Sequence, residues 1–378
     1  MAAIKQRINP DVLVWAMKQA GTSRTQLAGD LGTDPTTVDS WMTGDETPGL
    51  TQLRQIAKTL RRPTSLFFSP HVPAQRPLRA SFRKPFGSHG VRTLTSEERA
   101  EIRLAERRQK IANWAAERVE EHHPATLPTR QGTPEATAKS VQTWLHWNVS
   151  DQVKATSKLA VTKMVRRSLE DQGIMVLQLS LNSDACRGFS LYSETVPLIA
   201  YNSSQVAAAR TFTMLHELGH LISHEQAVCD QPEDSEERWC DRFAAAFLLP
   251  EEHLRAYIAK YLKITRVEND DIESVRRISN RYGASFQCVA LRLIHLGIAS
   301  QPLYRVVSSG SFEVDAPGFG GELQTTHLVR MREYGVTYPR LLLAARERGK
   351  LHDIDARKYL NVNGEQLRNL QQRIAEEV

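Results

Sequence analysis

The sequence lacks the features that would direct a chain into a membrane or an oxidising compartment. It contains no apolar run of about 18 residues, and its first residues, MAAIKQRINP, hold no apolar signal-peptide core. Its four cysteines are widely spaced without a CxxC pair, which does not suggest a disulfide framework. We therefore expect a cytoplasmic protein with no membrane partner. A length of 378 residues predicts two or three domains.

Acidic residues are missing from one long stretch of the chain. Between Thr47 and Thr95 there is no Asp or Glu, yet this stretch holds nine basic residues, more than the net charge of +6 of the whole chain. A solvated linker and a phosphate-contacting surface are both compatible with such a run of positive charge. Prolines recur through residues 63–96, so we expect this segment to be extended rather than helical.

Residues 1–66 predict an all-α helix-turn-helix domain. Its helix-start signals are Asn9-Pro10, Ser23 with Gln26, and Asp34-Pro35. The second helix of the motif, DPTTVDSWM, carries two aspartates and no Lys or Arg, a poor electrostatic match to DNA. The candidates for DNA contact are polar residues of this helix and basic residues near it in the sequence: Arg24, Thr36, Thr37, Ser40, Arg54, Lys58, Arg61 and Arg62. DNA binding and a helical protein-interaction role both remain open.

The rest of the chain completes a multidomain α+β organisation. Residues 67–135 combine the basic, proline-rich linker with a charged helix. Residues 136–300 are expected to form one domain, with strand candidates at 174–179, 188–192 and 198–202. Residues 301–378 predict a helical C-terminal segment after a glycine-rich loop at 309–321.

The segment TFTMLHELGHLISH, residues 211–224, gives the strongest indication of chemistry. His216 and His220 are four residues apart, so both imidazoles lie on one helix face and can reach one cation. Glu217 can accept the proton of an attacking water, and Gly219 lets another backbone or a substrate approach the helix. The alternative is a helix that carries two histidines by chance and binds no metal.

A catalytic zinc needs a third protein ligand. The nearby candidates are His224, Cys229, Asp230, Glu233, Asp234, Glu236 and Glu237. His224 continues the spacing, but a rigid helix cannot bring three imidazoles to one ion, so we interpret it as a surface or neighbouring histidine. Residues 236–250 predict a second, firmly packed helix whose first turn carries Glu237, a carboxylate that could complete the site. Asp241, one turn on, is placed to accept a hydrogen bond from a ligand histidine.

Two further requirements of metal-assisted hydrolysis have candidates in the sequence. The negative charge that develops on the scissile carbonyl needs an electrophilic partner, for which Arg187, Tyr192 and Tyr201 are available. An extended substrate could bind at a sheet edge, for which residues 196–202 are the candidate.

RTFTMLHELGHLISH followed by ExxCDRFAAAFLLP resembles the ImmA/IrrE family of bacterial zinc peptidases, whose typical pattern is FTLAHELGH followed by ExxANxFAxxLLMP. Residues 9–32 and the segment WMTGDETPGLTQLRQIAKTLRRP resemble the Xre/Cro-type helix-turn-helix often fused ahead of such peptidases. SFR at 81–83 stands where these fusions commonly carry DFR, and residues 334–362 resemble their usual C-terminal segment. The likeness is specific at 210–250 and more generic elsewhere.

The resemblance implies a zincin-like domain in which His216, His220 and Glu237 hold Zn²⁺ and Glu217 acts as general base. Asp241 stands where the family usually has Asn, and Cys240 replaces a usual alanine, but neither change removes a ligand.

The resemblance also implies an activity: cleavage of a partner protein, often a transcriptional repressor, in a stress, phage, mobile-element or toxin–antitoxin circuit. The alternative is a DNA-binding repressor or antitoxin-like protein whose peptidase fold binds or senses with little turnover. The run of positive charge in residues 47–96 motivates that alternative.

Overall fold

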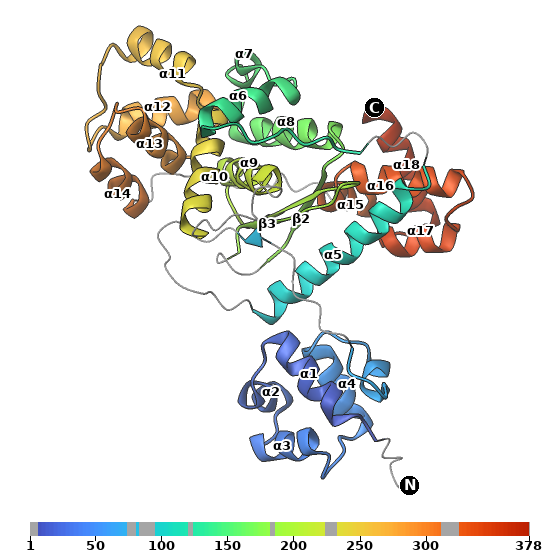
Figure 1. Cartoon of the computed structure of the whole chain (residues 1–378). Coiled ribbons are helices and arrows are strands. Elements are labelled where there is room, and N and C mark those ends of the chain that lie inside the picture. The colour runs from blue at the N-terminus through green and yellow to red at the C-terminus, as the bar shows by residue number, and fades with distance from the viewer. Residues whose placement is uncertain are drawn as a thin grey trace. The chain divides into compact units, whose positions relative to one another are not determined.

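A computed structural model describes residues 7–73, 81–82, 95–119, 124–181, 186–223, 233–310 and 325–377 (Figure 1). The chain divides into two compact units, Met1–Arg79 with Gly87–Ala105, and Ala80–Phe86 with Glu106–Val378. None of the described helices is long and apolar enough to cross a membrane.

The first unit contains the predicted helix-turn-helix domain. Its helices are α1 (Pro10–Ala20), α2 (Arg24–Leu31), α3 (Pro35–Thr43) and α4 (Leu50–Thr59). The predicted start signals are confirmed. Asn9 caps α1, Ser23 and Gln26 form a capping box at the N-terminus of α2, and Pro35 is the first residue of α3. The apolar faces of these helices meet in one core around Trp41, which is 2% exposed.

The expectation that residues 63–96 are extended is wrong for their first part. Thr64–Phe68 form a short 3₁₀ helix, η1, that follows Pro63. Phe67 is fully buried in the helix-turn-helix core, and the Asn9 side-chain amide donates a hydrogen bond to the Ser69 carbonyl at 3.0 Å. Burial of the Phe67 ring and this hydrogen bond outweigh the extended tendency of a proline-rich segment. The charged helix predicted after the linker is α5 (Ser96–Ala116).

The second unit is built on a four-stranded sheet in the order β1-β3-β4-β2. Its strands are β1 (Ser81–Phe82), β2 (Met175–Leu179), β3 (Gly188–Leu191) and β4 (Leu198–Asn202). β2 and β4 are parallel, and the other pairs are antiparallel. The three predicted strands are confirmed, whereas the interpretation of residues 196–202 as a sheet edge is wrong, because β4 lies between β3 and β2. Its continuous apolar sequence suits a strand buried on both faces and paired on both sides.

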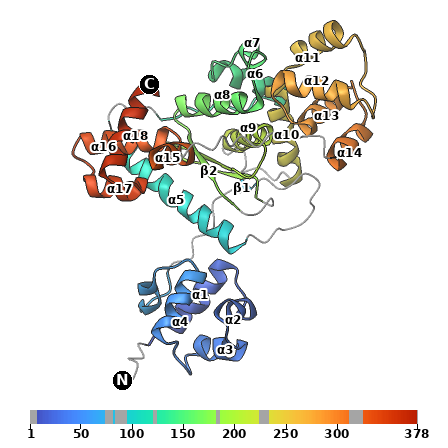
Figure 2. The same ribbon diagram turned by 180° about the vertical axis from the view of Figure 1, so that it is seen from behind.

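Helices α6 (Pro134–Trp144), α8 (Lys158–Asp171), α9 (Ala207–Ser223) and α10 (Glu233–Leu248) build the layer that covers the sheet. Figures 1 and 2 show α8 and α9 next to each other on the same side of the sheet, with α10 beyond α9. Helix α9 contacts α8, α10, β3 and β4, so it is enclosed on several sides. The main apolar core of the chain lies between these elements.

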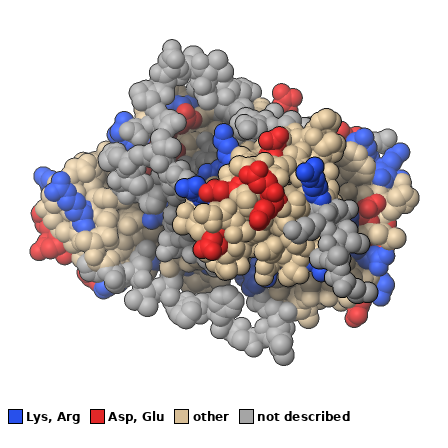
Figure 3. Space-filling view, turned by 90° about the horizontal axis from the view of Figure 1, so that it is seen from below, with Lys and Arg blue, Asp and Glu red and all other residues tan. Residues whose placement is uncertain are grey.

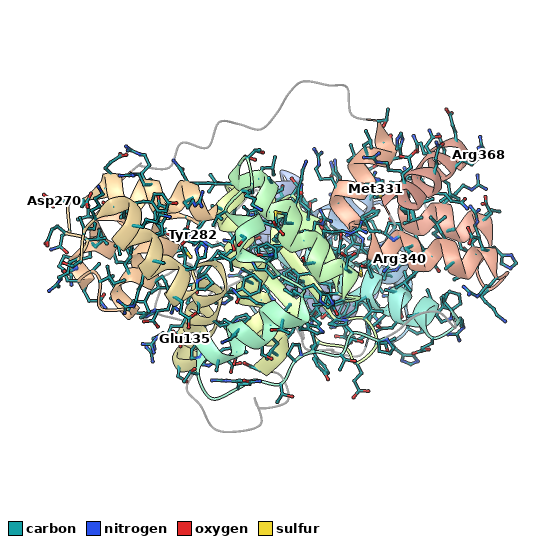
Figure 4. All side chains as sticks on the ribbon, turned by 90° about the horizontal axis from the view of Figure 1, so that it is seen from above. Glu135, Asp270, Tyr282, Met331, Arg340 and Arg368 are labelled. Atoms are coloured by element: carbon teal, nitrogen blue, oxygen red, sulfur yellow. The ribbon has the colours of Figure 1, made fainter. Side chains whose placement is uncertain are left out.

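The remaining described helices of this unit are α7 (Val149–Gln152), α11 (Glu251–Tyr257), the π-helix η2 (Ile258–Leu262), α12 (Ile272–Tyr282), α13 (Phe286–His295), α14 (Gln301–Ser309), α15 (Thr326–Tyr334), α16 (Thr337–Glu347), α17 (Asp353–Leu360) and α18 (Gly364–Glu377). Figure 4 labels Tyr282 on α12 and Met331 and Arg340 on the C-terminal helices. The buried Arg292 guanidinium joins α13 to Glu135 at 2.7 Å.

Candidate metal centre

The HELGH segment lies on a helix that is buried nearly all round. Every residue of α9 from Thr211 to Ser223 is buried, which fits its position between two helices and the sheet. His216 and Glu217 are fully buried, and His220 is 8% exposed. The charged and imidazole groups of the motif therefore lie in a site from which the fold largely excludes bulk water.

The structure brings three potential ligands together on α9 and α10. The Nε2 atoms of His216 and His220 are 3.1 Å apart. The two Glu237 carboxylate oxygens lie 3.4 Å from His216 Nε2 and 3.3 Å from His220 Nε2. In a tetrahedral zinc site with ligand distances of about 2.0–2.1 Å, neighbouring ligand atoms are separated by about 3.3–3.4 Å. The residues present therefore fit a zinc ion.

The electrostatics of these ligands are those of a cation site. Burial alone would raise the pKa of Glu237, but hydrogen bonds from His216 and His220 hold it well below its usual range. Burial disfavours charge on His220, but the neighbouring Cys240 thiol and the Glu236 and Glu237 carboxylates outweigh it and raise its pKa well above the ordinary value. Metal binding at such a site competes with protons for the ligand atoms.

Each histidine also has a partner behind its ring. Asp241 Oδ1 lies 2.9 Å from His216 Nδ1, at hydrogen-bond distance. A proton on Nδ1 leaves Nε2, the atom that faces Glu237, free to bind a metal. Glu236 Oε1 is 3.9 Å from His220 Nδ1, which makes it a looser partner and places it behind the ring rather than among the facing ligand atoms.

The Glu217 carboxylate lies against β3. Its Oε2 accepts a hydrogen bond from Ser190 Oγ at 2.9 Å. Its Oε1 is buried and has no hydrogen-bond partner among the described residues. Burial raises the pKa of Glu217, and the nearby His220, His216 and Ser190 oppose that rise. Sequence reasoning missed Ser190, because a serine inside a strand forms no motif with a helix 27 residues later.

The remaining candidates either make contacts away from the three potential ligands or lie outside the described residues. The Tyr201 hydroxyl donates to Gln178 Oε1 at 3.1 Å and lies 3.3 Å from Arg166 Nη1, so its polar end belongs to another cluster. Tyr192 is partly buried against the main core. Several third-ligand candidates lie outside what the structure describes: His224, Cys229, Asp230, and the side chains of Glu233 and Asp234.

On the helix-turn-helix domain the DNA-contact candidates fall into two sets. On α2 and α3, Arg24 pairs with Asp39 at 2.8 Å, and Ser40 Oγ donates to the Thr37 carbonyl at 2.9 Å. Thr36 is exposed. In the view from below, Asp and Glu side chains gather on this domain (Figure 3).

The second set lies on and just after α4. Arg54 and Lys58 are exposed. Arg61 Nη2 lies 3.8 Å from Glu97 Oε1. The Arg62 guanidinium carbon lies 4.8 Å from the centroid of the Trp15 ring, and burial lowers the pKa of Arg62.

Comparisons with known proteins match both domains. Residues 13–67 match the helix-turn-helix family, and residues 169–294 match the IrrE N-terminal-like domain of the Peptidase_M78 family. The chain thus has the domain pairing that the sequence predicted. No curated protein matches it. Among solved structures it is similar to a Mycobacterium tuberculosis transcriptional regulator, with 15% identity, a TM-score of 0.32, and coverage of 50% of this chain and 51% of that chain.

Proposed function

We propose that this chain is a zinc-dependent endopeptidase that hydrolyses a peptide bond in a partner protein. One observation carries the proposal: His216, His220 and Glu237 present ligand atoms that all lie within 4.8 Å of one another. A buried carboxylate with one unpartnered oxygen, that of Glu217, lies next to His216 in the chain. Metal-assisted hydrolysis requires at least a metal site and a nearby carboxylate that can accept and donate a proton.

The roles of the residues follow from these contacts. His216, His220 and Glu237 would hold the ion, and Asp241 would fix the His216 ring with Nε2 toward it. When bound, zinc supplies Lewis-acid polarisation of the scissile carbonyl and makes water more acidic. Glu217 takes the proton of the attacking water and delivers it to the leaving amine. Burial of Glu217 strengthens these electrostatic effects by excluding bulk water.

The helix-turn-helix domain supports a regulatory partner as the substrate. We propose that the partner is a transcriptional repressor or a component of a toxin–antitoxin system, cleaved in a stress, phage or mobile-element circuit. Because such a partner works on DNA, we place the reaction in the cytoplasm. This part of the proposal follows the family resemblance and the helix-turn-helix match at 13–67.

The test compares the zinc-loaded wild type with Glu217→Gln, a nearly isosteric change that leaves the three ligand residues in place. Each protein is incubated with extract of host cells, and new protein N-termini are labelled and identified by mass spectrometry. We expect new termini with the wild type only, in a protein with a DNA-binding domain. Identical sets of termini from the two proteins would rule out Glu217-dependent hydrolysis.

A second candidate function is DNA binding as a repressor or antitoxin-like protein. The exposed Arg54 and Lys58 on α4 favour it, because phosphate contacts need accessible positive charge. The two functions are compatible, since a DNA-bound peptidase could act on a neighbouring repressor. DNA binding that persists in Glu217→Gln while no cleavage is found in the wild type would favour this second function alone.

A further inference from the structure

Two residues of β3 lie against the carboxylate of Glu217. Side chains alternate along a strand, so Gly188 and Ser190 face the same side of the sheet. Ser190 Oγ donates to Glu217 Oε2 at 2.9 Å. A Cβ placed on Gly188 would lie 3.5 Å from Glu217 Oε1, 2.4 Å from Thr213 Cγ2 and 2.7 Å from the Ala200 carbonyl oxygen. The strand therefore approaches α9 so closely at Gly188 that only glycine fits, and this approach brings the Ser190 hydroxyl to the glutamate.

The two oxygens of Glu217 are in different situations. Oε2 is held by Ser190, whereas Oε1 is buried and has no partner among the described residues. A buried acceptor without a partner destabilises the folded state, because the hydrogen bonds that it makes with water in the unfolded chain are not replaced. Such a cost is understandable where the atom is kept free for a reacting group. One oxygen is thus fixed by the protein, and the other remains available.

Ser190 is held in place by the sheet. It is 3% exposed, and on its other flank it pairs through the backbone with Ser81 of β1. Its position is set by strand pairing on both sides, with β1 and with β4. A hydroxyl on such a rigid element can hold a partner in one orientation better than a hydroxyl on a loop.

We propose that Ser190 is a positioning residue for the hydrolysis. It holds Glu217 through Oε2, so that Oε1 is the oxygen that receives the proton from water and passes it to the leaving amine. In this exchange Oε1 gains one proton and later loses it, and Glu217 ends as it began. Gly188 provides the close approach that makes the Ser190 contact possible. The inference rests on the proposed peptidase function and adds to it the group that orients the base.

The first experiment measures kcat and KM with a peptide chosen from a proteome-derived peptide library as the sequence that the zinc-loaded wild type cleaves best. For Ser190→Ala we expect kcat to fall by about ten- to hundredfold, a part of the usual contribution of a general base, with KM and zinc content unchanged. Ser190→Thr, which restores a hydroxyl, should recover most of the lost kcat. The matched control is Ser279→Ala on α12, since Ser279 is also buried and donates to the Ala284 carbonyl at 2.7 Å. This control should lose stability and keep kcat.

A second experiment needs no turnover. Urea-unfolding midpoints are compared for Ser190→Ala, Glu217→Ala and the double variant. If the contact exists, Ser190→Ala lowers the midpoint less in the Glu217→Ala protein than in the wild type, because the acceptor is already gone. Equal decreases in both backgrounds would show that Ser190 does not act through Glu217 and would overturn the inference.

The outcomes separate this inference from the proposed function. A wild type that cleaves no peptide of the library and no protein of the extract overturns the peptidase function, and the positioning role with it. An active wild type with an equally active Ser190→Ala overturns only the positioning role. Loss of zinc in Ser190→Ala would assign the serine to the architecture of the site and also overturn its role in orienting the base.

Discussion

Gly219 of α9 lies directly against Cys240 of α10. A Cβ built on Gly219 would lie 3.0 Å from Cys240 Sγ and 3.2 Å from Phe243 Cδ1. The sequence suggested that this glycine lets a neighbouring element approach, and the structure shows that the element is α10. Because α10 carries Glu237, the missing side chain at 219 helps to bring the third potential ligand to the two histidines.

Gly219→Ala should therefore weaken zinc binding although it changes no ligand. The added methyl group must push α10 outward or force Cys240 aside, and overpacking of this kind typically costs about 1–3 kcal/mol of unfolding free energy. We expect a lower urea midpoint and a weaker zinc affinity by competition with a chelator. Gly29→Ala on α2 is the matched control, because a Cβ there would have nothing within 4 Å, and alanine favours a helix. Unchanged zinc affinity in Gly219→Ala would show that helix approach does not set the site.

Much of the fold could be predicted because its signals are local. Capping residues, apolar periodicity and glycine helix ends depend on a few neighbouring residues, and those elements were confirmed at Asn9 and Ser23. Phe67 could not be placed from neighbouring residues alone. The prolines around it favour an extended chain, whereas its 3₁₀ turn is explained by burial of the ring in the core of the domain. The order of strands is equally non-local, so the sequence of β4 alone does not show that it lies inside the sheet.

The residues of the candidate site also divide into those that local sequence predicts and those that depend on packing. The pair His216 and His220 follows from helical spacing alone. Choosing among the carboxylates of the next helix needed the family resemblance, because Glu236 and Glu237 are neighbours in the sequence. In the structure Glu237 faces the Nε2 atoms and Glu236 the Nδ1 side of His220. Ser190 could not be found, because its contact with Glu217 depends on the packing of β3 against α9.

Removal of the Glu237 carboxylate tests the ligand set directly. We expect near one zinc per chain in the wild type and loss or strong weakening of zinc in Glu237→Ala and His216→Ala. Glu236→Ala is the matched control: it removes a neighbouring carboxylate that lies 3.9 Å from His220 Nδ1, so it should reduce affinity much less. Metal content by plasma mass spectrometry decides the matter. Zinc unaffected by Glu237→Ala would refute this ligand assignment.

Asp241 should tune the affinity of the site through His216. Loss of a carboxylate behind a ligand histidine typically weakens metal binding about 10–100-fold. Asp241→Ala removes the acceptor that lies 2.9 Å from His216 Nδ1, so we expect a decrease in that range. Asp241→Asn keeps an oxygen acceptor and removes the charge, and should retain most of the affinity. An Asp241→Ala protein with wild-type affinity would show that the ring is held by packing alone.

The basic residues on α4 give a prediction for DNA binding. If Arg54 and Lys58 contact phosphates, their joint replacement by alanine should weaken DNA binding at all sequences and reduce the slope of log affinity against log salt by about two. Fluorescence anisotropy at several salt concentrations measures both effects. Arg24→Ala is the comparison, since Arg24 is already paired with Asp39 at 2.8 Å and should change the slope less. A wild type without DNA affinity would instead favour a protein partner for this domain.

His295 should make the stability of the chain depend on pH. Burial, followed by the charges of Arg242 and Arg292, lowers its pKa from 6.5 to about 4. Between these pH values the unfolded chain binds a proton that the folded chain does not, so the free energy of unfolding falls as pH falls. A group of this partial exposure contributes only about 1 kcal/mol after solvent screening. Urea unfolding of the wild type and His295→Gln from pH 7 to pH 4 isolates the effect. The wild type should lose stability relative to the variant between pH 6.5 and 4, and a pH-independent difference would contradict the lowered pKa.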